Sequence, residues 1–284
     1  MTVLLGCLAA ILFGFGDLLS GVGGRRDPST TTPVGIAFVA TVIGTVLGGL
    51  YVLLLTEDSL RGSDLWWAIG TGVAMSAARP LLYRGMAAGP MVVFAPIVAL
   101  VALVLPAVLG LVFGQSLAAL EIVGVILAVP AVVLLSSGRT LPSFAAFRSS
   151  SVVGNAAIVG GLIGIGALFM SFMSDDAGTA PALVVAAIGI VTIPLVGRSI
   201  GLPLRFSRTS VTFGLVIGCT SIGGLILSTF AYRGNAAIGS ALIGLSPGVS
   251  ILLAWRFLGE RFWRLQVVGS ICGITMVVLF ALAS

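Results

Sequence analysis

Long apolar runs, each about as long as a membrane is thick, are the feature of this chain that most restricts its fold. A helix of roughly 20 apolar residues spans the hydrocarbon core of a bilayer. Ten such runs can be drawn through the 284 residues: 3–23, 33–55, 65–86, 90–113, 119–136, 152–173, 180–199, 210–231, 235–257 and 263–283. The connections between them are too short for a soluble domain. The sequence therefore predicts an all-α polytopic membrane protein with ten transmembrane helices.

The positions of the charged residues predict how such a protein is oriented. Only 8% of the residues are charged, and all fourteen basic residues are Arg. Cytoplasmic connections carry an excess of basic residues. One side of the predicted membrane has eleven of them: Arg25, Arg26, Arg84, Arg139, Arg148, Arg198, Arg205, Arg208, Arg256, Arg261 and Arg264. The N-terminal side has two, Arg61 and Arg233. We therefore expect a multi-pass protein of the bacterial cytoplasmic (inner) membrane with both termini outside the cytoplasm, and the basic excess does not imply nucleic-acid binding.

The two halves of the chain resemble each other. The motif Tyr-Arg-Gly-x-Ala-Ala occurs at 83–88 and again at 232–237, 149 residues later. Residues 14–18 match 164–168 at an offset of 150, and Gly114, Glu121 and Gly124 match Gly259, Gln266 and Gly269 at an offset of 145. This predicts two five-helix repeats, 1–136 and 152–284, joined by a connecting loop at 137–151. Because five is odd, the second repeat enters the membrane from the opposite side, which is the inverted-repeat architecture of secondary transporters.

Several of these motifs resemble a known family. The segment Leu258-Gly259-Glu260-Arg261, followed by Leu265, Gln266, Gly269 and Gly273, is similar to the last-helix signature of EamA-type transporters of the drug/metabolite transporter (DMT) superfamily. The repeated Tyr-Arg-Gly motif before a proline-containing helix fits the same family, and the resemblance covers essentially the whole chain. One departure is Gln115, which stands where the second half has Glu260. Many ten-helix members have both termini in the cytoplasm, whereas the Arg distribution here places them outside, and we follow that distribution.

The resemblance implies a fold and an activity. It implies a central cavity surrounded by the first, third, fourth, sixth, eighth and ninth helices. It also implies export of small metabolites, amino acids or drugs.

Two ionisable residues, Asp17 and Arg79, interrupt the apolar spans. Each is the fifteenth residue of its span, so they share a depth in the membrane. Ionisable residues at this depth are costly and usually face a bundle interior or a water-filled cavity. They could form a structural ion pair between the first and third spans. Alternatively, Asp17 could bind a proton or a substrate amine, and Arg79 could bind a carboxylate or phosphate.

Milder polar and helix-bending residues complete the set of candidates. Pro96 and Pro247 lie in the fourth and ninth spans, at positions where a kink could form a hinge or a cavity wall. Ser76, Ser221 and Asn235 are further candidates for cavity lining or hinge positions. The alternative for the hydroxyl residues is a hydrogen bond to a carbonyl of their own helix.

Other features limit the function. The chain has no His, its three Cys fall within spans, and it has no nucleotide-binding loop of the GxxxxGK[ST] type. We therefore expect no metal, no cofactor and no enzymatic activity. The sequence predicts a secondary transporter that exports an amino acid, a related amphoteric solute or a drug-like cation by alternating access, with proton antiport and facilitation both open. A monomer would contain both repeats, and a dimer is also compatible. The alternative is a flippase or accessory subunit for a lipid-linked intermediate.

Overall fold

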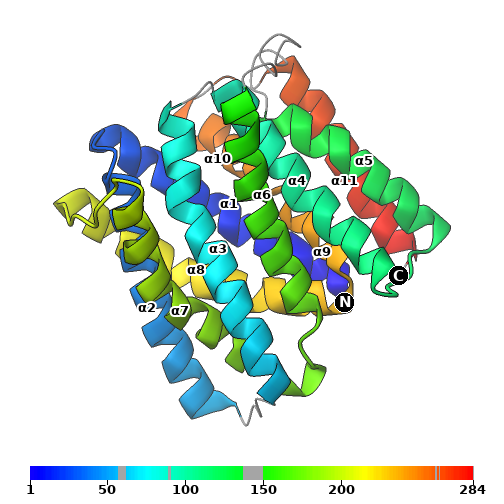
Figure 1. Ribbon diagram of the computed structural model, residues 1–284. Coiled ribbons are helices and arrows are strands. Elements are labelled where there is room, and N and C mark those ends of the chain that lie inside the picture. Colours follow the sequence, from blue (N-terminus) through cyan, green and yellow to red (C-terminus); the bar gives the residue numbers. More distant parts are fainter. Residues whose placement is uncertain (57–61, 89–90, 137–149, 260, 262, 284) are drawn as a thin grey trace.

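The computed structural model of the chain describes residues 1–56, 62–88, 91–136, 150–259, 261 and 263–283, and every regular element in these ranges is helical (Figure 1). The elements are α1 (Thr2–Arg26), α2 (Thr32–Leu55), α3 (Gly62–Ala88), α4 (Met91–Val112), α5 (Ala119–Ser136), α6 (Ser150–Ser171), η2 (Asp175–Ala177), α7 (Ala180–Ser199), α8 (Arg208–Gly234), α9 (Ala236–Ile243), α10 (Ser246–Leu258) and α11 (Arg264–Ala283). Helix therefore occupies each of the ten predicted spans. Most of the predicted connecting loop, 137–149, lies outside the described residues.

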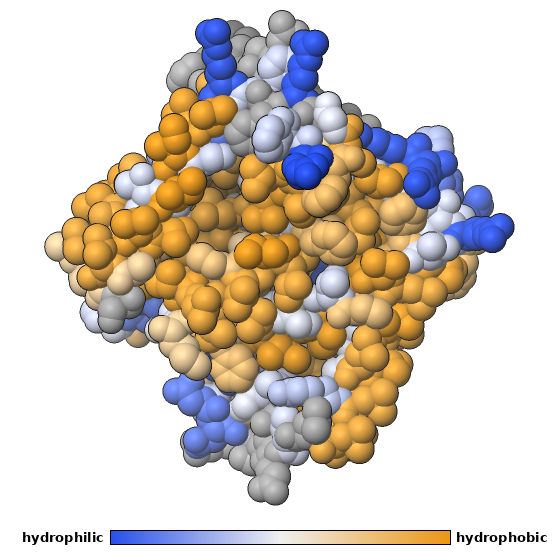
Figure 2. Space-filling model, turned by 180° about the vertical axis from the view of Figure 1, so that it is seen from behind, coloured by the Kyte–Doolittle hydropathy of each residue, from blue (hydrophilic) through white to orange (hydrophobic). Residues whose placement is uncertain are grey.

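Among the described residues, eight helical segments are long and apolar enough to cross a membrane, with α9 and α10 taken together as one. The two further predicted spans correspond to α3 and to the shorter α5. Large apolar side chains are exposed on the surface, for example Leu54 at 75%, Val112 at 72% and Ile274 at 65%. Figure 2 shows a broad apolar belt across one face of the molecule, with hydrophilic side chains above and below it. An apolar surface of this extent would be unfavourable in water and suits a lipid environment, so the chain is a multi-pass helical membrane protein.

Helices that are distant in the sequence pack against each other (Figure 1). The contacts form two matching sets when each helix of the first predicted repeat is compared with its counterpart in the second. In one set, α2 packs on α8, α1 packs on α8, and α4 packs on α6. In the other, α7 packs on α3, α6 packs on α3, and α9 and α10 pack on α1. Finally, α5 packs along α11.

Glycines allow the closest of these helix contacts. A Cβ atom placed on Gly218 of α8 would lie 2.6 Å from Cβ of Ile43 on α2, and one on Gly72 of α3 would lie 2.7 Å from Cβ of Ile188 on α7. Distances this short exclude a larger side chain unless the helices separate. Small residues at helix interfaces are typical of membrane proteins, in which lipid tails are as apolar as the protein.

The starts of α5 and α11 have the same local structure. Gly114 and Gly259 precede them with positive φ angles of 92° and 66°, which glycine adopts without strain. Oε2 of Glu121 accepts a hydrogen bond from the Ala118 N–H at 2.6 Å, and Oε1 of Gln266 accepts one from the Trp263 N–H at 3.0 Å. Each side chain thus satisfies a backbone donor at a helix start that lacks an intrahelical partner. The sequence match between these two segments therefore extends to their backbone geometry.

The ninth predicted span is divided. It forms α9 and α10, with a break at Gly244 and Leu245 just before Pro247. Proline has no N–H, so Pro247 cannot bond to the Ile243 carbonyl, whereas the first turn of a helix accepts proline readily. Pro247 therefore begins a new helix, while α4 continues through Pro96.

A polar contact links the end of α1 to the start of α8. Hydrogen bonds from the side chains of Ser207 and Thr32 hold the pKa of the Asp27 carboxyl below its usual value, and the Ser29 N–H adds a further bond at 3.4 Å. A carboxyl whose pKa is depressed on folding stabilises the fold above its unfolded pKa, and this stabilisation is lost as the pH falls through the folded pKa.

We expect Asp27→Asn to lower the melting temperature of the detergent-purified protein slightly at pH 7, because the amide accepts these bonds less strongly. The difference from the wild type should vanish once the pH is below the folded pKa of Asp27. Thermal unfolding across a pH series measures this. A difference that is equally large in acid would contradict the assignment.

Candidate functional site

A cavity of about 650 Å³ lies between α1 and α10 on one side and α3 and α4 on the other. Most of its lining is apolar. The polar side chains that face it are those of Asp17, Ser20, Tyr83, Tyr232, Ser240, Ser246, Ser250 and Gln266. All six spans expected to surround a cavity contribute lining residues. Single residues of α2, α5 and α11 complete the wall.

Asp17 is the carboxylate of this cavity, and α1 positions it. Asp17, Ser20, Gly21 and Gly24 all line the cavity, and their spacing of three and four residues places them on one helical face. Gly21 and Gly24 have no side chains, so the cavity continues from Asp17 along α1 toward the α1–α2 connection, where Pro33 also lines it. The side chain of Asp17 is surrounded by protein but remains solvent-accessible, because it borders this space. The cavity thus extends from Asp17 toward the end of the molecule that carries Arg25 and Arg26.

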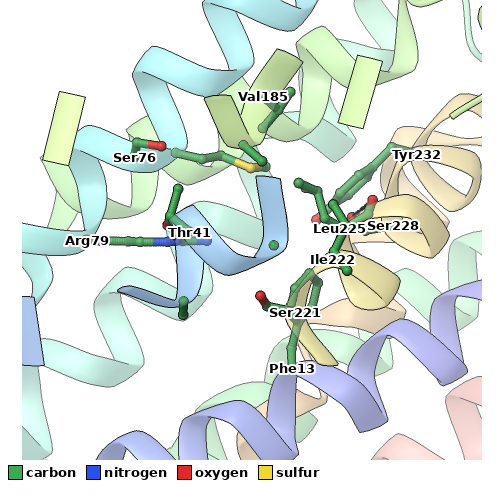
Figure 3. A pocket seen from close by; sticks show the side chains of 14 residues that line it. Phe13, Thr41, Ser76, Arg79, Val185, Ser221, Ile222, Leu225, Ser228 and Tyr232 are labelled. Carbon is green, nitrogen blue, oxygen red and sulfur yellow. Dashed lines mark hydrogen bonds between the residues drawn. The ribbon is translucent and has the colours of Figure 1, made fainter. Parts of the chain in front are cut away.

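Arg79 lines a second, smaller pocket of about 90 Å³ between α2, α3, α7 and α8 (Figure 3). Its side chain extends from α3 to α2, where Nη1 donates a hydrogen bond to Oγ1 of Thr41 at 3.0 Å. The Thr41 hydroxyl in turn donates to the Ala37 carbonyl at 2.8 Å. Because that bond uses its only proton, Thr41 is oriented as an acceptor for Arg79.

The two charges face adjoining spaces. Asp17 and Arg79 are close enough to interact electrostatically, but in the part of the chain that the structure describes neither forms an ion pair within 4.0 Å. Tyr232 lines both spaces and therefore lies between them. The Tyr83 hydroxyl is within electrostatic range of both charges and beside Ser20. The predicted pair is thus close in space without being joined directly.

Three of the four hydroxyl and proline candidates line one of the two spaces. Pro247 lines the large cavity, and Ser76 and Ser221 line the small pocket. Oγ of Ser221 also donates to the Gly218 carbonyl at 3.4 Å, which is the intrahelical bond considered as the alternative. Pro96 is buried within α4 and is not among the lining residues of either space.

Asn235 caps a helix. Its Oδ1 accepts hydrogen bonds from the N–H groups of Ala237 and Ile238 at 3.0 and 3.2 Å, and its Nδ2 donates to the Ser116 carbonyl at 3.3 Å. The residue therefore sets the angle between α8 and α9 at their junction. It is not among the lining residues of either space.

The sequence did not predict the residues that contact Arg79 or lie near both charges: Thr41, Tyr83 and Tyr232. The two tyrosines begin the two copies of the Tyr-Arg-Gly motif, so the repeat could have indicated them. Thr41 has no such signal, because a threonine within an apolar helix usually bonds to its own backbone.

An aromatic cluster lies at the end of the molecule opposite Arg25 and Arg26. The Trp67 ring lies 5.3 Å from that of Phe169 and 5.1 Å from that of Phe172, and Phe113 meets Phe172 edge-on at 5.4 Å. Beside them, the carboxylate of Asp64, only 1% exposed, accepts bonds from the N–H and Oγ of Ser174 at 2.8 and 2.7 Å. These contacts join α3, α4 and the segment after α6.

Comparison with known proteins identifies the fold alone. No protein-family model and no curated protein matches the chain. Among solved structures 29 chains match. One crystal structure aligns with 99% of this chain and 97% of its own, with a TM-score of 0.77 and 17% sequence identity. The similarity covers the whole bundle, and at this identity it carries no information about activity.

Proposed function

We propose that the protein is a secondary transporter that exports a small metabolite by alternating access through the large cavity. The observation that carries this proposal is the membrane-depth carboxylate of Asp17, which faces a cavity of about 650 Å³ inside a multi-pass helical bundle. This volume is within the usual range for small-molecule sites. Charged groups inside membrane proteins commonly mark substrate or ion pathways.

Matched helix contacts support the second part of the proposal, which is a ten-span chain built from two inverted repeats of the EamA type. The contact of Gly72 with Ile188 corresponds to that of Gly218 with Ile43, each residue being displaced by 145 or 146 positions. The similar starts of α5 and α11, and the packing of α2 on α8 and of α7 on α3, point in the same direction. Substrate sites in such folds lie at the repeat interface, often beside a discontinuous helix. The break between α9 and α10 borders the cavity in this way.

The proposed substrate is an amino acid or a related amphoteric solute, with a drug-like cation as the other option. Asp17 would bind its amino group or exchange it for a proton. The apolar remainder of the cavity would accommodate the side chain of the solute. We place the protein in the bacterial inner membrane, with the Arg-rich end in the cytoplasm and both termini outside.

Alternating access requires the cavity to open at the end opposite Arg25 and Arg26, and we propose that the aromatic cluster closes this end at rest. We expect Trp67→Ala to favour opening, because it removes two ring contacts. A cysteine introduced at Ser246 in the cavity should then react about threefold or more faster with an impermeant maleimide added from the cluster side, a shift of roughly 0.7 kcal/mol if labelling follows the open population. The matched control is Trp66→Ala, since that side chain is 72% exposed. Equal labelling in both variants would show that the cluster does not close this end.

Counterflow in proteoliposomes tests the proposed function. Purified protein would be reconstituted and supplied with radiolabelled amino acids and organic cations, with empty liposomes as the reference. Saturable exchange of one solute class is the expected result. If folded protein exchanges none of them but moves a fluorescent lipid between leaflets, the flippase alternative replaces this proposal.

A further inference from the structure

We infer that the pocket around Arg79 is a binding subsite for a small monoanionic group, separate from the cavity that holds Asp17. The chemistry fits either the carboxylate of a transported solute or a free inorganic anion such as chloride. The inference extends the proposed function. It can be tested on purified protein without any transport measurement.

The charge of Arg79 is the first step of the argument. A guanidinium stays protonated at every relevant pH, and an uncompensated charge inside a bilayer is costly. Its contact with Thr41 is to a neutral hydroxyl, and Asp17 borders the other space. No described carboxylate forms an ion pair with Arg79. Asp17 is within electrostatic range of Arg79 but does not contact it. An anion in the pocket would supply a counter-charge in direct contact with the guanidinium.

The donor groups of the pocket are the second step. A guanidinium carries five N–H donors, and the contact with Thr41 uses one. The hydroxyl residues Ser76, Ser221 and Ser228 line the same pocket, the latter two from α8 opposite α3 (Figure 3). The Ser228 hydroxyl already donates to the Leu225 carbonyl at 2.8 Å, so Ser76 and Ser221 are the available hydroxyl donors. The weak 3.4 Å bond of Ser221 to its own helix could be exchanged for a bond to an anion. The pocket thus combines one fixed cation with two available hydroxyl donors, and no carboxylate is among its described lining residues. This combination favours anions over cations and metal ions.

The size of the pocket is the third step. Its volume of about 90 Å³ is roughly a seventh of the 650 Å³ of the large cavity. Gly44 helps to keep it open, because a Cβ there would lie 3.5 Å from Oγ of Ser221 and would narrow the space beside that hydroxyl. The space admits a chloride ion or a single carboxylate group but not a whole metabolite. A solute carboxylate would have to reach it past Tyr232, which lines both spaces.

Thermal unfolding of the detergent-purified protein tests this inference. Chloride would be titrated against gluconate at constant ionic strength, and sodium acetate would be titrated as the small carboxylate. The wild type should show a saturable rise in melting temperature. Arg79→Gln should remove this rise. Ser221→Ala should raise the anion concentration that gives half of the rise at least about threefold. This second variant also tests the inference if the Arg79 variant does not fold. The matched control is Arg84→Gln, five residues along the same helix and exposed, which should keep the full response.

The outcomes separate the two sources of the anion. A response to both chloride and acetate, with competition between them, assigns the pocket to free anions. A response to acetate alone assigns it to a substrate carboxylate. No saturable response to either, or an equal response in wild type and Arg79→Gln, overturns the inference. A positive anion response without any counterflow would count against the transporter proposal and leave the subsite standing.

Discussion

Replacing Asp17 by asparagine is expected to reduce counterflow by at least about tenfold while leaving the folded protein intact. The amide has nearly the same shape, so the cavity keeps its volume, but the negative charge that would bind a proton or an amine is lost. Tenfold corresponds to about 1.4 kcal/mol of lost binding or coupling energy, a modest demand for a charge-assisted contact in a partly desolvated site. Counterflow at several pH values, measured beside the melting temperature, tests this prediction.

The melting temperature separates a functional carboxylate from a structural one. Breaking a buried ion pair usually costs several kcal/mol, since it leaves a charge without its partner. Asp17 forms no such pair within 4.0 Å among the described residues, so we expect little change in stability. The control is Asp175→Asn, which changes an exposed carboxylate in η2 and should transport normally. Normal transport by Asp17→Asn at every pH would exclude Asp17 from the transport site.

Gly160→Ala is expected to lower the melting temperature by several degrees, the largest effect that we predict on stability. A Cβ on Gly160 of α6 would lie 2.6 Å from the Val98 carbonyl oxygen and 2.8 Å from Cβ of Val101, both on α4. Backbone atoms cannot rotate away, so α6 and α4 would have to separate. Overpacking of this kind costs about 1–3 kcal/mol. Val98 also lines the cavity, so the separation should weaken transport as well.

The neighbouring residue offers a matched control. Gly161→Ala lies on the same helix, and nothing is within 4 Å of the Cβ it would add. Both changes gain the same helix propensity, so the difference between them reports packing alone. Equal melting temperatures for the two variants would mean that α6 and α4 do not approach as closely as described.

The sequence was most informative about helices and least informative about side-chain partners. Apolar runs placed helix in all ten predicted spans, because burial in lipid demands a continuous helical backbone and few charges. The break before Pro247 was less predictable. Pro96, at a comparable point in α4, leaves its helix continuous, so the outcome depends on neighbouring helices rather than on proline itself.

The candidate site was predictable only in part. Asp17 and Arg79 stood out, because charge is rare within these spans, but their separation into two spaces depends on tertiary packing. The partner of Arg79 is Thr41, 38 residues away on another helix, and no local pattern connects them. Tyr232 likewise gains its position between the two spaces only when α8 packs beside α1 and α2.

The most direct test of the account is whether one cavity position is reachable from both sides of the membrane. The three native cysteines, Cys7, Cys219 and Cys272, are unpaired and would be replaced, and Ser246→Cys would be introduced in the cavity wall. Inverted and right-side-out vesicles would then be labelled with an impermeant maleimide, with and without the solute found by counterflow. We predict labelling from the Arg-rich face at rest and from the opposite face during exchange. Labelling from one face alone under every condition would contradict alternating access.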